Sequence, residues 1–158
     1  IIVNVQGDEP CLPAALINQV AGDLNQHHDA DIATLYSQIT QEKQIFDPNV
    51  VKVVMDKDGY AMYFSRSTIP YDRTRFLNED SVASIGDFYL RHIGIYAYKT
   101  KVLNEICKLP QSKNEKKESL EQLRWLDNGC KINVGITNFE SISVNTPEDI
   151  IRIDAKMR

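Results

Sequence analysis

The sequence of 158 residues contains few cysteines, and they lie far apart. Cys11, Cys107 and Cys130 are odd in number and form no CxxC pair. An even number of cysteines is the usual sign of a disulfide framework, and CxxC pairs are the usual sign of a structural zinc site. We therefore expect three reduced thiols, with neither a disulfide framework nor a zinc site.

The sequence also lacks a long apolar run and an excess of positive charge. No stretch approaches the roughly 20 apolar residues that a membrane-spanning helix needs, and no secretory signal is visible. With 18 basic and 22 acidic residues, the formal net charge is −4. This balance argues against a general basic surface for nucleic acid, although a local basic patch for a small anion stays open. We expect a soluble, cytoplasmic protein with no nucleic-acid or membrane partner.

No internal repeat, low-complexity tract or linker is present. The chain is 42% hydrophobic and 25% charged, and its length suits one globular core better than two. We expect residues 1–158 to form a single domain. Because the chain begins inside a strand-like segment without an initiator methionine, we also expect it to be a piece of a longer protein that lacks its amino-terminal part.

Helical and strand-like patterns alternate along the chain. Strand patterns cover 1–5, 31–39, 50–55, 60–65, 88–99 and 130–137, and helical patterns or caps cover 13–25, 100–108, 116–128 and the segment from 146 onward. The tetrapeptide DKDG at 56–59 predicts a hairpin turn, and the polar range 70–87 predicts a long loop. This order predicts a three-layer α/β domain with a mixed, mostly parallel sheet.

The first segment, IIVNV, reads as a buried strand and ends abruptly in polar residues. Gly7 permits backbone angles closed to other residues, and Pro10 fixes the exit of the chain. In open α/β sheets, ligands bind outside the carboxyl ends of the strands. Asp8 is therefore a candidate ligand-site carboxylate. The alternative is a turn aspartate that accepts hydrogen bonds from nearby backbone N–H groups.

Basic residues gather at two places. Arg66, Arg73 and Arg75 lie in SRSTIPYDRTR, and His92 follows Arg91 in RHIGIY. A single arginine on a loop is more often solvated or structural than bound to a ligand. Within a strand, a histidine is most often hydrogen-bonded and half-buried. Each segment is weak evidence when taken alone.

Three polar residues share one face of the helix predicted at 116–128. Glu118, Glu121 and Gln122 stand at i, i+3 and i+4, so they are neighbours on the helix surface. This face is either part of a polar binding site or simply solvated.

Taken together, the motifs resemble those of the sugar-acid cytidylyltransferases, in particular those that act on 3-deoxy-manno-octulosonate (Kdo). The matching segments cover essentially the whole chain: VNVQGDEP, DPNVVKVVMDKDGYAMYFSRSTIPYDR, YLRHIGIYAY, ESLEQLRWLDNG and VNTPEDI. VQGDEP alone indicates only the wider class of sugar nucleotidyltransferases, whereas SRSTIPYDR, LRHIGIYAY and LEQLR in this order are specific. The resemblance implies a Rossmann-like nucleotidyltransferase fold.

The resemblance also implies an activity and a site. CMP would pass from CTP to the anomeric hydroxyl of Kdo by direct in-line attack, with Mg²⁺ and release of pyrophosphate, for lipopolysaccharide synthesis in a Gram-negative cytoplasm. Asp8 would be the catalytic metal carboxylate, with Glu118 a further candidate near the sugar acid. The residues implied to line the sugar-acid pocket are Gln6, Arg66, Arg73, His92, Tyr96, Glu121 and Gln122.

Family members resemble one another in forming homodimers. The strand predicted at 88–99 carries more apolar side chains than one sheet face needs, namely Tyr89, Ile93, Ile95, Tyr96 and Tyr98. We therefore expect part of this strand to meet a partner subunit.

The chain departs from the family pattern at two places. A glycine-rich and basic loop resembling RxxSxRLPGKP, which would wrap the CTP phosphates, is missing, so these residues alone are expected to be inactive. Family members read VDTPED where this chain has Asn145, the second implied metal ligand, which offers a carbonyl oxygen but no negative charge and should weaken Mg²⁺ binding. The alternatives are a CMP-sialic acid synthetase-like enzyme and a non-catalytic sugar-acid-binding or interaction domain.

Overall fold

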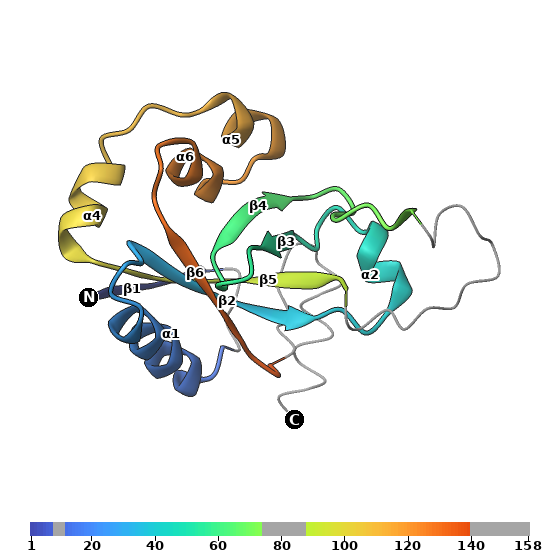
Figure 1. Ribbon diagram of the computed structural model, residues 1–158, viewed down its shortest axis with the longest axis horizontal. Coiled ribbons are helices and arrows are strands. Elements are labelled where there is room, and N and C mark those ends of the chain that lie inside the picture. Colours follow the sequence, from blue (N-terminus) through green and yellow to red (C-terminus); the bar gives the residue numbers. More distant parts are fainter. Residues whose placement is uncertain (8–11, 74–87, 140–158) are drawn as a thin grey trace.

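A computed structural model describes residues 1–7, 12–73 and 88–139, which build a sheet between helices (Figure 1). The strands are β1 (Ile2–Val5), β2 (Ile32–Gln38), β3 (Lys52–Met55), β4 (Ala61–Ser65), β5 (Leu90–Tyr98) and β6 (Ile132–Ile136). The helices are α1 (Ala14–Gln26), α2 (Glu42–Phe46), α4 (Thr100–Ile106), α5 (Lys113–Glu118) and α6 (Gln122–Asp127). All six predicted strands are confirmed, as are the helices predicted at 13–25 and 100–108.

The six strands form one sheet in the order β4-β3-β5-β2-β6, with β1 also paired to β5. The mixed sheet is confirmed, but the expectation of mostly parallel ladders is not met among the described strands. Only β2 and β6 pair in parallel, because β5 lies in the middle of the sheet and runs antiparallel to β1, β2 and β3. β1, β2, β3 and β6 nevertheless all point the same way.

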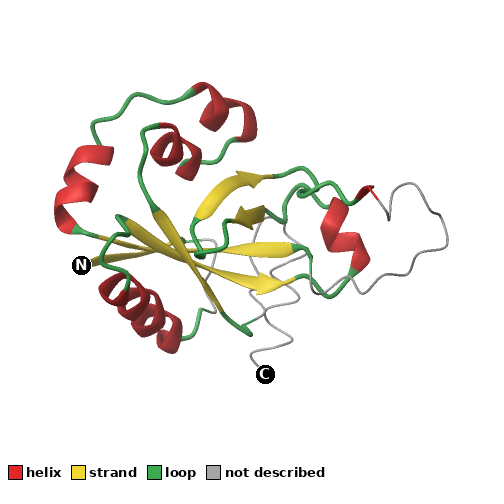
Figure 2. Ribbon diagram, viewed as in Figure 1, coloured by secondary structure: helices red, strands yellow, loops and turns green. Residues whose placement is uncertain are grey.

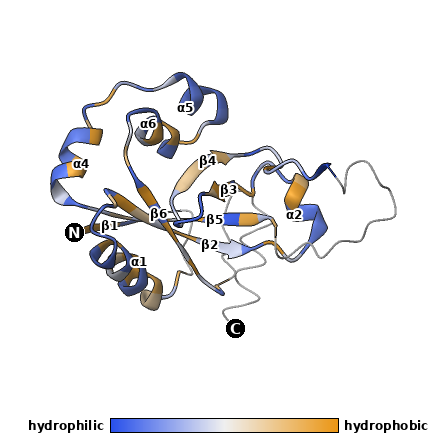
Figure 3. Cartoon of the chain, viewed as in Figure 1, coloured by the Kyte–Doolittle hydropathy of each residue, from blue (hydrophilic) through white to orange (hydrophobic). Residues whose placement is uncertain are grey.

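Two hydrophobic cores on opposite faces of the sheet confirm the three layers. α1 lies on one side and α4, α5 and α6 on the other (Figures 1 and 2). The core under α1 contains Leu16, Val20, Leu24, Ala30, Ala33, Leu35, Ile93, Ile95 and Ala97. The opposite core contains Ile32, Val53, Phe64, Tyr96, Tyr98, Ile106, Leu120, Leu123, Trp125, Ile132 and Val134. The strands carry much of the apolar sequence, whereas α5 is hydrophilic (Figure 3).

The strand β1 forms as predicted, but it is not buried. Ile2 and Val5 are each 41% exposed. β1 pairs with β5 alone among the described strands, so its other edge and part of its apolar surface stay uncovered by the described residues. Hydrophobicity therefore predicted the strand correctly and its burial incorrectly.

The helix predicted at 116–128 is two short helices. Ser112 and Glu115 form a capping box at the start of α5, and Ser119 ends it with a left-handed φ of 53°. Leu120, in the turn that follows, is buried in the core. Because the helix breaks at this point, Glu118 does not share a helical face with Gln122, and the predicted i, i+3, i+4 arrangement is wrong.

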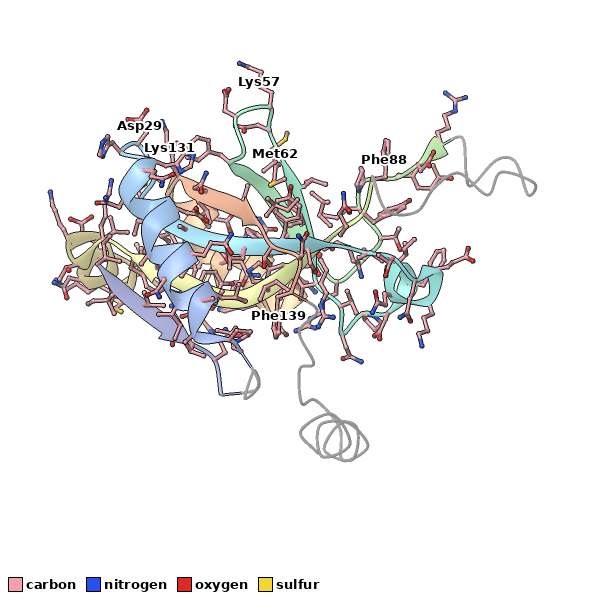
Figure 4. The ribbon with its side chains drawn as sticks, turned by 90° about the horizontal axis from the view of Figure 1, so that it is seen from below. Asp29, Lys57, Met62, Phe88, Lys131 and Phe139 are labelled. Carbon is pink, nitrogen blue, oxygen red and sulfur yellow. The ribbon has the colours of Figure 1, made fainter. Side chains whose placement is uncertain are left out.

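The hairpin predicted around DKDG is confirmed. β3 and β4 pair antiparallel, and Gly59 adopts a φ of 82°, which a glycine accommodates without strain. The side chain of Lys57 points away from the sheet at the tip of this turn (Figure 4).

The apolar side chains of β5 are covered within the single chain. Ile93 and Ile95 pack in the core under α1, and Tyr96 and Tyr98 pack in the opposite core. Tyr89 is also buried. The argument that this strand has surplus apolar surface for a partner is therefore wrong, because helices cover both faces of the sheet.

Several predictions lie outside the described residues, namely the helix from 146, most of the loop at 70–87, and Cys11. The thiols of Cys107 and Cys130 are free, as expected. None of the helices in the described part of the chain is long and apolar enough to cross a membrane.

Candidate active site

The candidate site lies at a gap between β1 and β3 along one edge of β5, which we call the split in the sheet. Val5 of β1 lies opposite Ile95 of β5, and Lys52 of β3 lies opposite Arg91. β2 pairs with β5 along its whole length on the other edge, so β1 and β3 share one edge of β5. The carboxyl end of β1 and the amino end of β3 therefore meet beside residues 92–94. In open α/β sheets, ligands bind outside the carboxyl ends of the strands, and the carboxyl end of β1 lies at this junction.

His92 lies at this junction and is nearly buried. Its ring packs against Phe64, with centroids 5.0 Å apart, and against Tyr96 at 5.4 Å. Its Nε2 is 2.9 Å from the hydroxyl of Thr34 on β2. Burial, reinforced by the positive charge of Arg91, lowers the pKa of His92 to about 3. The imidazole is therefore neutral at physiological pH, so it can offer hydrogen bonds but no positive charge.

Aromatic side chains connect the junction to α6. The indole of Trp125 meets Tyr96 edge-on at 5.1 Å and Tyr98 at 5.5 Å. Burial, with further contributions from Tyr98 and the negative charge of Glu121, raises the pKa of Tyr96 well above its usual value. The phenol therefore stays protonated. These contacts bring the first turn of α6 next to β5.

The two polar residues at the start of α6 face different ways. Gln122 is 4% exposed and lies on the side of α6 that meets the core. Glu121 has a side chain that is 57% exposed and pairs with Arg124 one turn later. Gln122 is therefore enclosed by the protein, whereas Glu121 is largely exposed and its negative charge contributes to the raised pKa of Tyr96.

The guanidinium of Arg66 is held by main-chain carbonyls. Its Nε donates to the carbonyl oxygen of Glu118 at 2.7 Å, and its two terminal nitrogens donate to Pro48 at 2.9 Å and Ser119 at 3.4 Å. These bonds use three of the five N–H groups of the guanidinium. Arg66 thus has the structural role that is common for an arginine on a loop, and two of its N–H groups have no acceptor within the described ranges.

Lys52, beside this arginine, is fully buried. Its ammonium donates to the carbonyl oxygens of Asp47 at 3.0 Å, Val50 at 2.7 Å and Arg66 at 2.7 Å. These three acceptors match its three N–H donors. Burial lowers the pKa of Lys52, while Asp47 and Glu118 oppose the shift. Lys52 therefore ties the segment before β3 to the end of β4.

The remaining predicted residues are less enclosed or lie outside the described residues. Gln6 and Arg73 are both exposed, the first just after β1 and the second after β4. Asp8 and Asn145 are among the residues that the structure does not describe. The structure thus brings His92 into contact with Tyr96 and Arg66 into contact with Glu118.

Sequence reasoning missed Thr34 and Lys52. Thr34 gave no signal, because a threonine within a strand is ordinary. Lys52 did give one, since it interrupts the apolar run VVKVV, and a charge inside such a run requires buried partners. Within the described ranges, no group of three or more His, Cys, Asp or Glu side chains is placed to hold a metal ion.

Comparison with known proteins identifies the family of the chain. A family model described as cytidylyltransferase matches residues 1–132. Relatives named 3-deoxy-manno-octulosonate cytidylyltransferase include one from Pseudoalteromonas atlantica, 53% identical over 97% of this chain and 61% of the relative. Another, from Thermodesulfovibrio yellowstonii, is 47% identical over 95% of this chain and 57% of the relative.

A solved structure of CMP:2-keto-3-deoxy-manno-octonic acid synthetase complexed with CTP is also similar. It matches with a TM-score of 0.83 and 35% identity, over 98% of this chain and 60% of that one. The chain spans about 60% of the length of these relatives. The chain belongs to the cytidylyltransferase family.

Proposed function

We propose that the protein containing residues 1–158 transfers CMP from CTP to the anomeric hydroxyl of Kdo, giving CMP-Kdo and pyrophosphate. The observation that carries this proposal is the 53% identity, over 97% of the chain, to a relative named for this reaction. In this proposal, the specificity for the sugar acid comes from the segments that contain Arg66, His92 and Gln122.

The site residues have distinct tasks in this proposal. His92 and Gln122 offer neutral hydrogen-bonding groups, which suit the many hydroxyl groups of a sugar acid. Arg73 is an exposed arginine at the end of the SRSTIPYDR motif, and a guanidinium can pair with a carboxylate through two parallel bonds. Gln6, Tyr96 and Glu121 complete the proposed pocket.

Mg²⁺ belongs to the proposal as the cofactor. Asp8 would hold it through a carboxylate, and Asn145 would add a carbonyl oxygen. When bound, Mg²⁺ supplies charge neutralisation at the phosphate oxygens of the nucleotide. In the proposed reaction, the anomeric oxygen of Kdo forms a bond to the α-phosphorus of CTP, the bond from that phosphorus to pyrophosphate breaks, and the hydroxyl proton is released to solvent.

The test is pyrophosphate release by the full-length protein. We expect turnover with CTP, Kdo and Mg²⁺, and little or none when UTP or ATP replaces CTP. Replacing Kdo with N-acetylneuraminic acid distinguishes the CMP-sialic acid type of enzyme. Turnover with the sialic acid but not with Kdo would overturn the proposed substrate.

A non-catalytic sugar-acid-binding protein is the second candidate, and Asn145 is the residue that favours it, because a neutral amide holds Mg²⁺ less well than a carboxylate. Titration calorimetry with Kdo alone separates the two. Kdo binding in a full-length protein that releases no pyrophosphate at any Mg²⁺ concentration would support this second function.

The cellular setting is part of the same proposal. We place the enzyme in the cytoplasm, as a homodimer, in lipopolysaccharide precursor synthesis. Sedimentation of the full-length protein tests its assembly, and a monomer at all concentrations would remove the dimer.

A further inference from the structure

An irregularity in the sheet places Thr34 next to His92. Thr34 lies opposite Tyr96, but the next residue, Leu35, lies opposite Ile93. β5 therefore carries two extra residues at this point, and the ladder between β2 and β5 is locally interrupted. Bulges of this kind often lie next to binding sites, where they redirect a side chain.

The hydroxyl of Thr34 occupies the interruption. It is 2.7 Å from the carbonyl oxygen of Ile95 and 3.3 Å from that of Ile93. The same oxygen is 2.9 Å from Nε2 of His92. Thr34 is completely buried, so solvent offers no alternative partner for its hydroxyl.

The donors and acceptors in this group admit one arrangement. A carbonyl oxygen only accepts, so the single hydroxyl proton of Thr34 points to Ile95, at the shorter of the two distances. The hydroxyl must then accept a hydrogen bond from His92. Nε2 therefore carries the proton of the neutral imidazole, and Nδ1 carries a lone pair.

Aromatic side chains hold the imidazole ring of His92 in its position beside Thr34. Phe64 meets it edge-on with an interplanar angle of 80°, and Tyr96 packs against it at 41°. His92 is 9% exposed, so a small part of the residue reaches the surface.

We propose that Thr34 is a positioning residue, which fixes the tautomer of His92 with the proton on Nε2, so that Nδ1 accepts a hydrogen bond from a hydroxyl group of the sugar acid. The part that concerns the sugar acid rests on the proposed function, whereas the tautomer does not. The lone pair on Nδ1 of His92 repels a carboxylate, so the carboxylate of the substrate binds to arginine side chains instead. The low pKa of His92 agrees with this assignment, because the ring stays neutral with Arg91 and Tyr96 beside it.

Two substitutions of Thr34 test the proposal in the full-length protein. Thr34→Val keeps the shape of the side chain but removes the hydroxyl, and Thr34→Ser keeps the hydroxyl. Thr137→Val is the matched control, because the hydroxyl of this nearly buried threonine accepts from the backbone of Phe139 and not from a histidine.

The first measurement is the tautomer of His92, read from the nitrogen chemical shifts of labelled protein without substrate. We expect the proton on Nε2 in the wild type, in Thr34→Ser and in Thr137→Val, and a mixture of tautomers in Thr34→Val. A wild-type ring protonated on Nδ1 would overturn the proposal, and this reading needs neither a folded Thr34→Val variant nor activity.

The second measurement is the KM for each substrate. Loss of one oriented hydrogen bond should raise the KM for Kdo about two- to tenfold in Thr34→Val, with the KM for CTP unchanged and with rescue in Thr34→Ser. Equal changes in both KM values would show a structural role only. A protein that does not turn over Kdo would remove the proposed function and the sugar-acid part of this inference, while the nitrogen shifts would still decide the tautomer.

Discussion

Arg66 and Glu118 hold each other's main chain. The carboxylate of Glu118 accepts a hydrogen bond from the backbone N–H of Arg66 at 3.0 Å, and Nε of Arg66 donates to the backbone carbonyl of Glu118 at 2.7 Å. The second carboxylate oxygen accepts from the hydroxyl of Ser65 at 2.6 Å. This reciprocal pair joins the end of β4 to the turn between α5 and α6, which are distant in sequence.

Replacing Glu118 should therefore loosen two segments together. Glu118→Ala leaves the hydroxyl of Ser65 and the N–H of Arg66 without their acceptor, which we expect to cost about 2–4 kcal/mol of unfolding free energy. Glu118→Gln keeps one acceptor oxygen and should cost about half as much. Urea unfolding of the full-length protein measures both. Equal stability of Glu118→Ala and the wild type would mean that these bonds are replaced by water at no cost.

Lys52 gives a prediction with a defined pH dependence. Its pKa in the folded state lies below the value of 10.5 for a free lysine. Between these two values the unfolded chain binds more protons, so the contribution of Lys52 to stability rises with pH in that window. At lower pH, Lys52 is protonated in both the folded and the unfolded state. The full free-energy cost of burying its charge then lowers the stability of the folded protein.

The comparison with Lys52→Met isolates this contribution. Near neutral pH, the variant loses the donor to three carbonyl groups but also removes a buried charge, so we expect a net loss of about 1–3 kcal/mol. As the pH rises toward 10.5, the wild type should gain stability relative to Lys52→Met. Thermal unfolding of both proteins at several pH values measures the difference, and a gap that stays constant or shrinks would contradict the lowered pKa.

Gly135 of β6 lies close to Asp23 of α1. A Cβ atom at this residue would lie 2.2 Å from Oδ2 of Asp23 and 3.1 Å from Cδ2 of Leu35. Oδ2 of Asp23 is itself buried without a hydrogen-bond partner within the described residues, and burial raises the pKa of this carboxyl group.

We expect Gly135→Ala to destabilise the protein by about 1–3 kcal/mol, because the carboxyl group of Asp23 must move. In the double variant Asp23→Ala and Gly135→Ala, the clash disappears and part of the loss should be recovered. A double-mutant cycle of melting temperatures measures this coupling. Strict additivity of the two substitutions would show that the contact is relieved without cost.

The sequence predicted most helices and strands well, because they depend on the local pattern of apolar and polar residues. The strands and α1 follow from runs and spacing of apolar residues, and the hairpin follows from a glycine that turns with a positive φ. The break at Ser119 could not be predicted in this way. Serine has no special preference for the left-handed region. Ser119 adopts this conformation where the chain turns to bury Leu120 in the core.

The candidate site was predicted only in part, for a similar reason. Motif resemblance selected His92 and Arg66, but it could not show that the fold saturates most of Arg66 with main-chain carbonyls. The contact between Thr34 and His92 depends on a bulge that shifts the register of two strands. No spacing within either strand reveals such a shift, since each strand alone alternates normally.

The metal prediction concerns Asp8 and Asn145. If Asp8 supplies the one charged ligand of the pair, Asp8→Asn should abolish magnesium-dependent turnover of the full-length protein while changing its melting temperature little. Asn145→Asp should lower the Mg²⁺ concentration needed for half-maximal activity, because a second carboxylate binds this hard cation more strongly than an amide oxygen does. Titration of Mg²⁺ at saturating CTP and Kdo, with pyrophosphate release as the signal, measures both. An Asp8→Asn protein that keeps its magnesium response, or an Asn145→Asp protein with the wild-type midpoint, would show that the metal is held elsewhere.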